Sequence, residues 1–83
     1  MKLVYFAWVR ERIGISEEEV DLPPEVATVR ELLAWLKRRG DGYAEALQVP
    51  EVIRVALDQE HADHAEPLGN AREIALFPPM TGG

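Results

Sequence analysis

The chain ends in FPPMTGG, the stretch whose residue types are best suited to chemistry. Pro78 and Pro79 restrict φ and donate no hydrogen bond, so they end a strand and favour a stiff, extended exit. Gly82 and Gly83 have no Cβ, so the backbone could enter a channel too narrow for other residues. Fully extended, the last six residues reach roughly 20 Å. The stretch predicts a thin arm that delivers the α-carboxylate of Gly83 into another protein's active site.

The rest of the sequence offers no set of residues with catalytic logic. There is no cysteine, which removes disulfides, zinc thiolates and a thiol nucleophile. No Ser-His-Asp arrangement, phosphate loop or catalytic carboxylate pair is visible. His61 and His64 have a spacing that joins two metal ligands on a helix, but their stretch reads as a hairpin, and we interpret it as a solvated turn. We therefore predict no metal site and no catalysis by the isolated chain.

Composition predicts one soluble domain. The chain has 83 residues, of which 47% are apolar and 29% charged. No apolar run approaches the ~20 residues of a membrane span, and the apolar start is too short for a signal peptide. We expect a cytoplasmic protein that does not associate with membranes. The formal net charge of −6 makes nucleic acid a poor partner and suits a basic protein partner instead.

The N-terminal half predicts two strands and one helix. Lys2 to Ala7 alternates as a strand does, and Gly14 marks a turn. A second strand is expected at Val20–Leu22, with the run Glu17–Glu19 at its solvent-exposed start. Thr28-Val29-Arg30-Glu31 is a capping-box pattern, and the apolar helix face that follows consists of Val29, Leu32, Leu33 and Leu36. Gly40 is the expected residue after the helix C-terminus, and a short helical turn is possible at residues 43–47.

The C-terminal half predicts strands at residues 51–57 and 73–77, with a polar hairpin or edge strand between them. Leu68 is expected to fill part of the core. The element order predicts an α+β fold, with a mixed sheet of four to five strands and one main helix packed on one face. The other face of the sheet should be partly open. Period-2 counting puts Phe6 and Phe77 on it, which predicts a docking surface, although single exposed aromatic residues are also common.

Three segments carry a resemblance to a known family. They are the ending FPPMTGG, the opening LVYFAWVRE, and VALDQEH before the last strand. Together they resemble the small subunit of molybdopterin synthase, over essentially the whole chain. The resemblance implies a ubiquitin-like β-grasp domain at residues 1–77 and a flexible C-terminal tail at residues 78–83.

The resemblance also implies a mechanism. An E1-like adenylating enzyme uses ATP to convert the carboxylate of Gly83 into an acyl-adenylate, and a sulfur donor then yields a thiocarboxylate. The loaded carrier docks on the large synthase subunit, in a heterotetramer of two small and two large subunits. There the sulfur is transferred to cyclic pyranopterin monophosphate, which builds the molybdopterin dithiolene. The chain itself binds no cofactor in this scheme and serves as the non-catalytic, sulfur-donating subunit.

Site residues carry over position by position. Gly83 is the reactive residue and Gly82 its slender neighbour, and the arm is lined by Pro78, Pro79, Met80 and Thr81. Phe6 and Phe77 match the family's apolar docking positions, in agreement with the counting above. A third docking position falls on His61, where relatives can have an apolar residue. Asp58 replaces a common Asn, and residues 70–72 replace a frequent Asp-Gly-Asp turn.

Three other functions remain open. The chain could be a Gly-Gly sulfur carrier of another pathway, such as thiamine thiazole synthesis, although those carriers usually lack the Pro-Pro exit. It could be a ubiquitin-like modifier that is conjugated to lysines. It could also be a β-grasp interaction module with an inert tail, since chain ends commonly fray.

Overall fold

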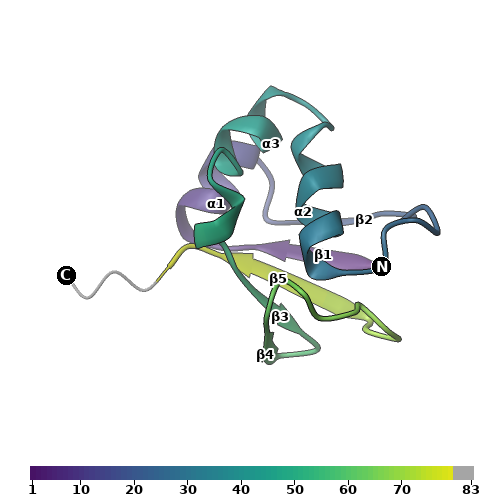
Figure 1. Ribbon diagram of the computed structural model, residues 1–83. Helices are drawn as coiled ribbons and strands as arrows, with labels where there is room; N and C mark the ends of the chain where they lie inside the picture. The colour runs from purple at the N-terminus through teal and green to yellow at the C-terminus, as the bar shows by residue number, and fades with distance from the viewer. Residues whose placement is uncertain (80–83) are drawn as a thin grey trace.

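The computed structural model describes residues 1–79, which form a five-stranded mixed sheet with helices on one side (Figure 1). The strand order is β2-β1-β5-β3-β4. The central pair, β1 and β5, is parallel, and all other neighbours are antiparallel. The elements in chain order are β1 (Lys2–Tyr5), α1 (Ala7–Ile13), β2 (Glu17–Glu19), α2 (Val29–Lys37), α3 (Asp41–Ala46), the 3₁₀ turn η1 (Pro50–Val52), β3 (Arg54–Leu57), β4 (Glu60–Ala62) and β5 (Glu73–Phe77).

Helix α2 begins as the capping box predicts. The Thr28 hydroxyl accepts a hydrogen bond from the Glu31 amide at 3.2 Å, and the Glu31 carboxylate accepts one from the Thr28 amide at 3.0 Å. The carboxylate also accepts the Ala27 amide, and these backbone N–H groups hold the pKa of Glu31 below its usual value. All four residues of the predicted apolar face are buried against the sheet. The capping and the buried face of the main helix are thus confirmed.

The segment after α2 differs in part from the prediction. Helix α2 ends at Lys37, and Gly40 is the residue before α3, with extended backbone, rather than the cap of α2. The short helical turn is confirmed as α3. A Cβ on Gly42 would lie 2.7 Å from the carbonyl oxygen of Arg12, so the backbones of α1 and α3 approach more closely than any side chain permits.

Helix α1 was not predicted, and the expected strand at residues 2–7 ends at Tyr5. Ala7 has a φ of 51°, in the left-handed region, which turns the chain out of the strand and into the helix. Val9 is fully buried beneath the helix. The turn at Gly14 is confirmed: its φ is 100°, and its amide donates to the Arg10 carbonyl at 2.8 Å.

The second strand lies earlier than expected. The run Glu17–Glu19 is itself β2, whereas residues 20–22 form no strand. Antiparallel pairing sets Glu18 opposite Leu3, so the side chain of Glu18 points to the helix-covered side. Val20 is buried beyond the end of the strand, and its amide donates to the Met1 carbonyl at 2.9 Å. Three consecutive glutamates therefore form the edge strand, although their composition alone favours a solvated segment that is not paired in a sheet.

The C-terminal half follows the prediction with one change. Strand β3 begins at Arg54, because Pro50 starts a 3₁₀ turn that occupies residues 50–52. Asp58 and Gln59 have φ values of 48° and 72°, as a two-residue type I′ hairpin turn requires. The Asp58 carboxylate accepts hydrogen bonds from the Arg72 and Glu73 amides, which joins this hairpin to the start of β5. Strand β5 and the burial of Leu68 are as predicted.

The core lies between the sheet and the helices. The residues of β1 and β5 that face the helices are at most 1% exposed: Leu3, Tyr5, Ile74 and Leu76. The alternate residues face away from the helices, and in the described part of the chain no element covers them. Within residues 1–79, no helix is long and apolar enough to cross a membrane.

Candidate functional site

The uncovered face of the sheet carries both aromatic residues predicted for docking. Val4 pairs with Ala75 across the parallel β1–β5 contact, and the Phe6 amide donates to the Leu76 carbonyl at 3.1 Å. Phe6 therefore continues the alternation of side chains along β1 and lies on the same, uncovered face as Phe77. The Phe6 side chain is 47% exposed, while Phe77 is half-buried. The positions that period-2 counting gave are those observed, with Phe77 less exposed than expected.

His61 lies on the same face, on the edge strand β4. It pairs with Ala56 of β3, which in turn pairs with Ala75 of β5, so these side chains share one side of the sheet. His61 is exposed, whereas the Nε2 atom of His64 lies 2.7 Å from the Ile53 carbonyl oxygen. Among the described residues, no group of three His, Asp or Glu side chains could hold a metal ion. The fold thus places the three proposed docking positions on one face of the sheet.

Arg54 is a further residue of this face that the sequence did not single out for docking. It pairs with Phe77 across β3 and β5 and is exposed. Beside it lies a pocket of about 400 Å³, whose walls come from η1, the ends of β3 and β4, and Pro79. The alternation of residues in the sequence already predicted that Arg54 faces outward from the sheet. Its place beside the aromatic pair depends on the β3–β5 register, which the sequence does not reveal.

The arm begins directly at this face. Strand β5 ends at Phe77, and the half-buried Pro78 and Pro79 follow without forming a strand. Met80, Thr81, Gly82 and Gly83 lie outside the described residues, so their roles stay predictions. Pro79, the last described residue, lines the pocket beside Arg54.

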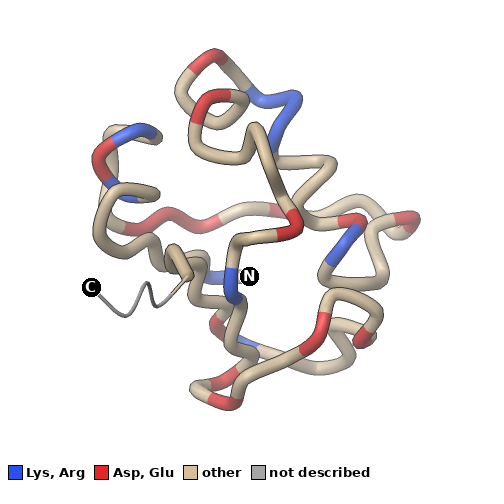
Figure 2. The backbone as a smooth tube through the Cα atoms, turned by 60° about the vertical axis from the view of Figure 1, so that its left-hand side comes forward, with Lys and Arg blue, Asp and Glu red and all other residues tan. Residues whose placement is uncertain are grey.

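Charges border the uncovered face and are spread over the rest of the molecule. At the end of β1 remote from Phe6, the Lys2 ammonium lies 3.5 Å from the Glu17 carboxylate and 3.9 Å from that of Glu73. Figure 2 shows Asp and Glu on strands, helices and loops alike. The face therefore carries Phe6, Phe77 and the single cation Arg54 at one end and the Lys2 ion pairs at the other, so a partner can be oriented by the charges and held by the aromatic residues.

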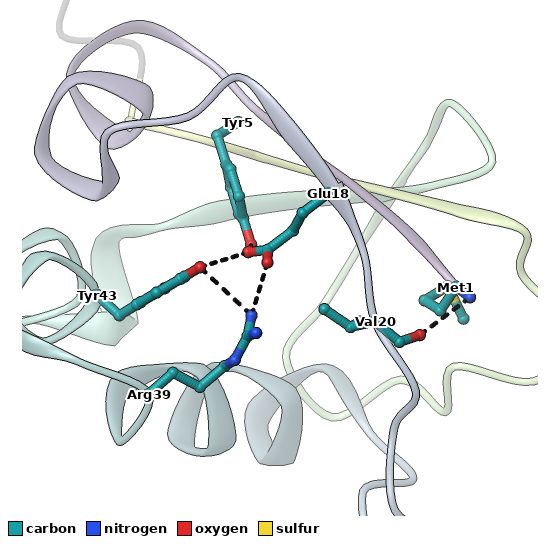
Figure 3. A network of polar contacts seen from close by, with 6 residues as sticks. All are labelled: Met1, Tyr5, Glu18, Val20, Arg39 and Tyr43. Atoms are coloured by element: carbon teal, nitrogen blue, oxygen red, sulfur yellow. Dashed lines mark hydrogen bonds and ion pairs between the residues drawn. The ribbon is translucent and has the colours of Figure 1, made fainter.

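A polar cluster on the opposite, helix-covered side involves the inward-pointing Glu18 (Figure 3). Its carboxylate accepts hydrogen bonds from the hydroxyls of Tyr5 and Tyr43, each at 2.6 Å, and from Arg39 at 2.9 Å. Burial alone would raise the pKa of Glu18, but these three donors outweigh it and hold the pKa below its usual value. Burial and the bond to Glu18 raise the pKa of Tyr5 far above that of a free tyrosine. The cluster joins β1, β2, α3 and the segment between α2 and α3.

The fold defines the class of protein. A five-stranded mixed sheet with a main helix packed on one face is a ubiquitin-like β-grasp domain. The chain belongs to the ThiS family, whose model matches residues 3–83.

Individual relatives agree with this assignment. The chain is 34% identical over 83 residues to the molybdopterin synthase sulfur carrier subunit of Haemophilus influenzae. The alignment covers 100% of this chain and 99% of the relative. It superposes on a putative molybdopterin converting factor, subunit 1, from Pyrococcus furiosus with a TM-score of 0.72 and 28% identity, over 95% of each chain. Small archaeal modifier protein 1 of Haloferax volcanii gives 0.71 and 29%, over 96% of this chain and 97% of that one. These relatives support a sulfur-carrier role.

Proposed function

We propose that this chain is the sulfur-carrier subunit of a molybdopterin synthase, and that Gly83 carries the sulfur. The observation that carries the proposal is the family match, which extends to residue 83 and so includes the Gly-Gly end. The fold adds support, because β5 leads through Phe77 into the arm at the edge of an uncovered apolar face.

The chemistry follows from the reactivity of a carboxylate. The Gly83 carboxylate is a poor electrophile until one of its oxygens becomes a leaving group. A partner enzyme of the E1-like class supplies this by joining the carboxylate to the AMP part of ATP, with release of pyrophosphate. A sulfide equivalent from a sulfur donor then displaces AMP and leaves a thiocarboxylate. Two successive transfers, each of one sulfur atom from a newly loaded carrier, build the dithiolene on cyclic pyranopterin monophosphate, and water returns the Gly83 end to a carboxylate each time.

The chain's own contribution is to dock and to position the arm. Phe6, Phe77 and His61 form the face that meets the large synthase subunit, and Arg54 orients that contact beside Phe77. Met80 and Thr81 line the arm between the prolines and the glycines, and Gly82 permits passage through a narrow channel. The complex is a heterotetramer of two small and two large subunits in the cytoplasm. The carrier needs no bound cofactor, because ATP acts in the adenylating enzyme.

The first test is the intact mass of the full chain after incubation with its adenylating enzyme, ATP and a sulfur donor. We expect a mass gain equal to the replacement of one oxygen by sulfur, located at Gly83 by fragmentation. Two controls share the same folded domain: a chain that lacks Gly83, and a chain extended by one alanine beyond it. Both should fold normally and gain no sulfur. Sulfur gain by the extended chain, or none by the native chain, would sink the proposal.

A second candidate is a ubiquitin-like modifier, favoured by the similarity to small archaeal modifier protein 1. Both functions begin with an adenylated C-terminus, so they differ only in the nucleophile that follows. A modifier forms an amide with a lysine of another protein. Covalent conjugates in source cells that disappear when Gly83 is deleted would support this candidate, and a thiocarboxylate without conjugates would exclude it.

A further inference from the structure

A second surface of the molecule, on the helical side, has the features of a binding groove. The groove lies between α2 and η1, has a volume of about 210 Å³, and is lined by Arg30, Leu33, Ala34, Lys37, Pro50, Glu51 and His64. It is smaller than the ~300–1,000 Å³ typical of small-molecule sites, so it suits protein side chains better than a whole cofactor. The uncovered sheet face contributes none of these residues.

The helix wall of the groove has a regular pattern. Arg30, Leu33, Ala34 and Lys37 are spaced i, i+3, i+4, i+7 on α2, which forms one straight stripe along the helix. The two apolar residues lie in the middle and the two cations at the ends. Seven residues at ~1.5 Å each separate the cations by about 10 Å along the axis.

The opposite wall consists of Pro50, Glu51 and His64. Pro50 starts η1, and Val49 and Val52 beside it are 53% and 41% exposed, two of the four large apolar residues that are exposed in residues 1–79. His64 holds its place through the contact of its Nε2 atom with the Ile53 carbonyl oxygen at 2.7 Å. His64 is thereby held in place at the groove, whereas Val49 and Val52 lie outside the residues that line it.

Charge sets this surface apart from the rest of the chain. The molecule has a net charge of −6, but the groove presents two cations against the single carboxylate of Glu51. Within residues 1–79, neither Arg30 nor Lys37 forms an ion pair, a property that they share with every other Lys and Arg except Lys2 and Arg39. Two unpaired cations that flank an apolar floor complement an acidic, amphipathic partner.

We propose that this groove docks an acidic amphipathic helix of a partner protein. The helix presents carboxylates at i and i+7, opposite Arg30 and Lys37, and apolar side chains at i+3 and i+4, which enter the groove above Leu33 and Ala34. A helix fits because its side-chain spacing matches that of the α2 stripe, whereas an extended strand alternates its side chains between two faces. The groove adjoins the pocket beside Arg54, with which it shares Glu51 and His64, but it contains neither Phe6 nor Phe77, so a partner can hold the carrier here while those aromatic residues engage another protein. The inference does not depend on sulfur transfer.

The test uses a designed peptide and the full chain. The probe is a helical peptide of about 20 residues, long enough to populate a helix, with Glu at i and i+7 and Leu at i+3 and i+4. Its control is a scrambled peptide of identical composition. In a ¹⁵N-labelled titration we expect amide shifts confined to α2, η1 and the His64 loop, and binding that weakens with salt. Inorganic phosphate is titrated separately, to detect a site that binds any small anion.

Variants of exposed charged residues show which charges contribute to the affinity for the peptide. The double variant Arg30→Glu and Lys37→Glu should weaken binding of the peptide at least about tenfold, because two attractions become repulsions. The matched control, Arg10→Glu with Arg72→Glu, changes the net charge equally and should leave affinity within about twofold. The proposal would be overturned if the scrambled peptide bound equally well, or if the control variant lost as much affinity as the double variant. Amide shifts centred on Phe77, the same shifts with phosphate, or no shifts at all would overturn it too.

Discussion

The two faces of the sheet are made by the same strands and differ in almost everything else. On the helix side, Leu76 is fully buried together with Leu3 and Ile74 of the same face. Even the edge strand β2 turns the carboxylate of Glu18 inward, where it accepts three hydrogen bonds. On the other side, Phe6 is 47% exposed and Phe77 half-buried. Adjacent residues of one strand thus have different tasks: Leu76 stabilises the domain, and Phe77 is available to a partner.

The difference explains how a small domain can both fold and dock. Helices cover only one side of the sheet, so apolar residues on the other side contribute little to folding and can be kept for binding. The free energy of unfolding and the affinity for a partner should therefore respond to different residues. The following changes test this separation, in order of decreasing expected effect on stability.

Leu76→Ala should have the largest effect. The side chain is 0% exposed in the centre of the core, and such truncations cost ~2–5 kcal/mol because they leave a cavity. Urea unfolding followed by circular dichroism measures the change. The neighbouring Phe77→Ala serves as the comparison and should cost less than half as much. Similar losses in both variants would mean that the two faces are not energetically distinct.

Gly42→Ala tests the helical layer. The added Cβ would lie 2.7 Å from the Arg12 carbonyl oxygen, so α1 and α3 must move apart. Overpacking of this kind costs ~1–3 kcal/mol. Gly40→Ala is the matched control, because a Cβ there meets its nearest side-chain atom at an ordinary 3.7 Å. If Gly42→Ala unfolds at the same urea concentration as the wild type, the close approach of α1 and α3 is not a real constraint.

Glu18→Gln removes the charge from the helix-side cluster and should cost ~1–3 kcal/mol, as expected for hydrogen bonds to a charged group. Glu17→Gln, one residue away on the exposed side, is the control and should cost about 0–1 kcal/mol. Thermal unfolding at neutral pH compares the two. Equal losses would show that the inward carboxylate has no special role.

The same cluster predicts how stability depends on pH. The folded-state pKa of Glu18 is lowered, so its contribution is present above the unfolded pKa of about 4.3 and is lost as the pH falls through the folded value. The pKa of Tyr5 is raised, so its contribution is present below about pH 10 and is lost as the pH rises further. Free energies of unfolding measured across pH should show both limbs. Glu18→Gln should flatten the acid limb, and Tyr5→Phe the alkaline one.

Phe6→Ala should have the smallest effect on folding. Nearly half of the side chain is already in water, so the cost in unfolding free energy should stay below about 1 kcal/mol. Affinity for the large synthase subunit should nevertheless fall at least tenfold, as for a central aromatic anchor, a loss of ~1.4 kcal/mol or more. Calorimetric titration checks this. Unchanged affinity, or a loss of stability larger than the loss of affinity, would contradict the division between the faces.

Local signals in the sequence predicted several elements well. The capping box, the apolar stripe and the cationic end of α2 all lie within one short segment, so no distant contact is needed to specify that helix. Strand β5 is bounded by a turn before it and by Pro78 after it. For Phe6 and Phe77, period-2 alternation was enough to find the correct face, because a strand has only two.

The missed elements depend on distant contacts. Leu3 and Tyr5 alternate as though the strand continued to Ala7, and only packing against α3 and the core selects a helix instead. Glu17–Glu19 reads as a solvated run, and it forms a strand because Tyr5, Tyr43 and Arg39, from β1, α3 and the segment before α3, converge on Glu18. The location of Arg54 next to Phe77 likewise required the β3–β5 register.

By itself, the sequence determined the helix-forming segment, the alternation of the strands, the end of the sheet at Pro78 and the chemistry available at Gly83, because each depends on neighbouring residues. The tertiary structure alone decided the register between strands, which sets Arg54 beside Phe77, and it decided where the half-buried carboxylate of Glu18 finds its donors and that a groove forms between α2 and η1. Those features require segments far apart in the chain to meet, and no local pattern encodes the distance between them.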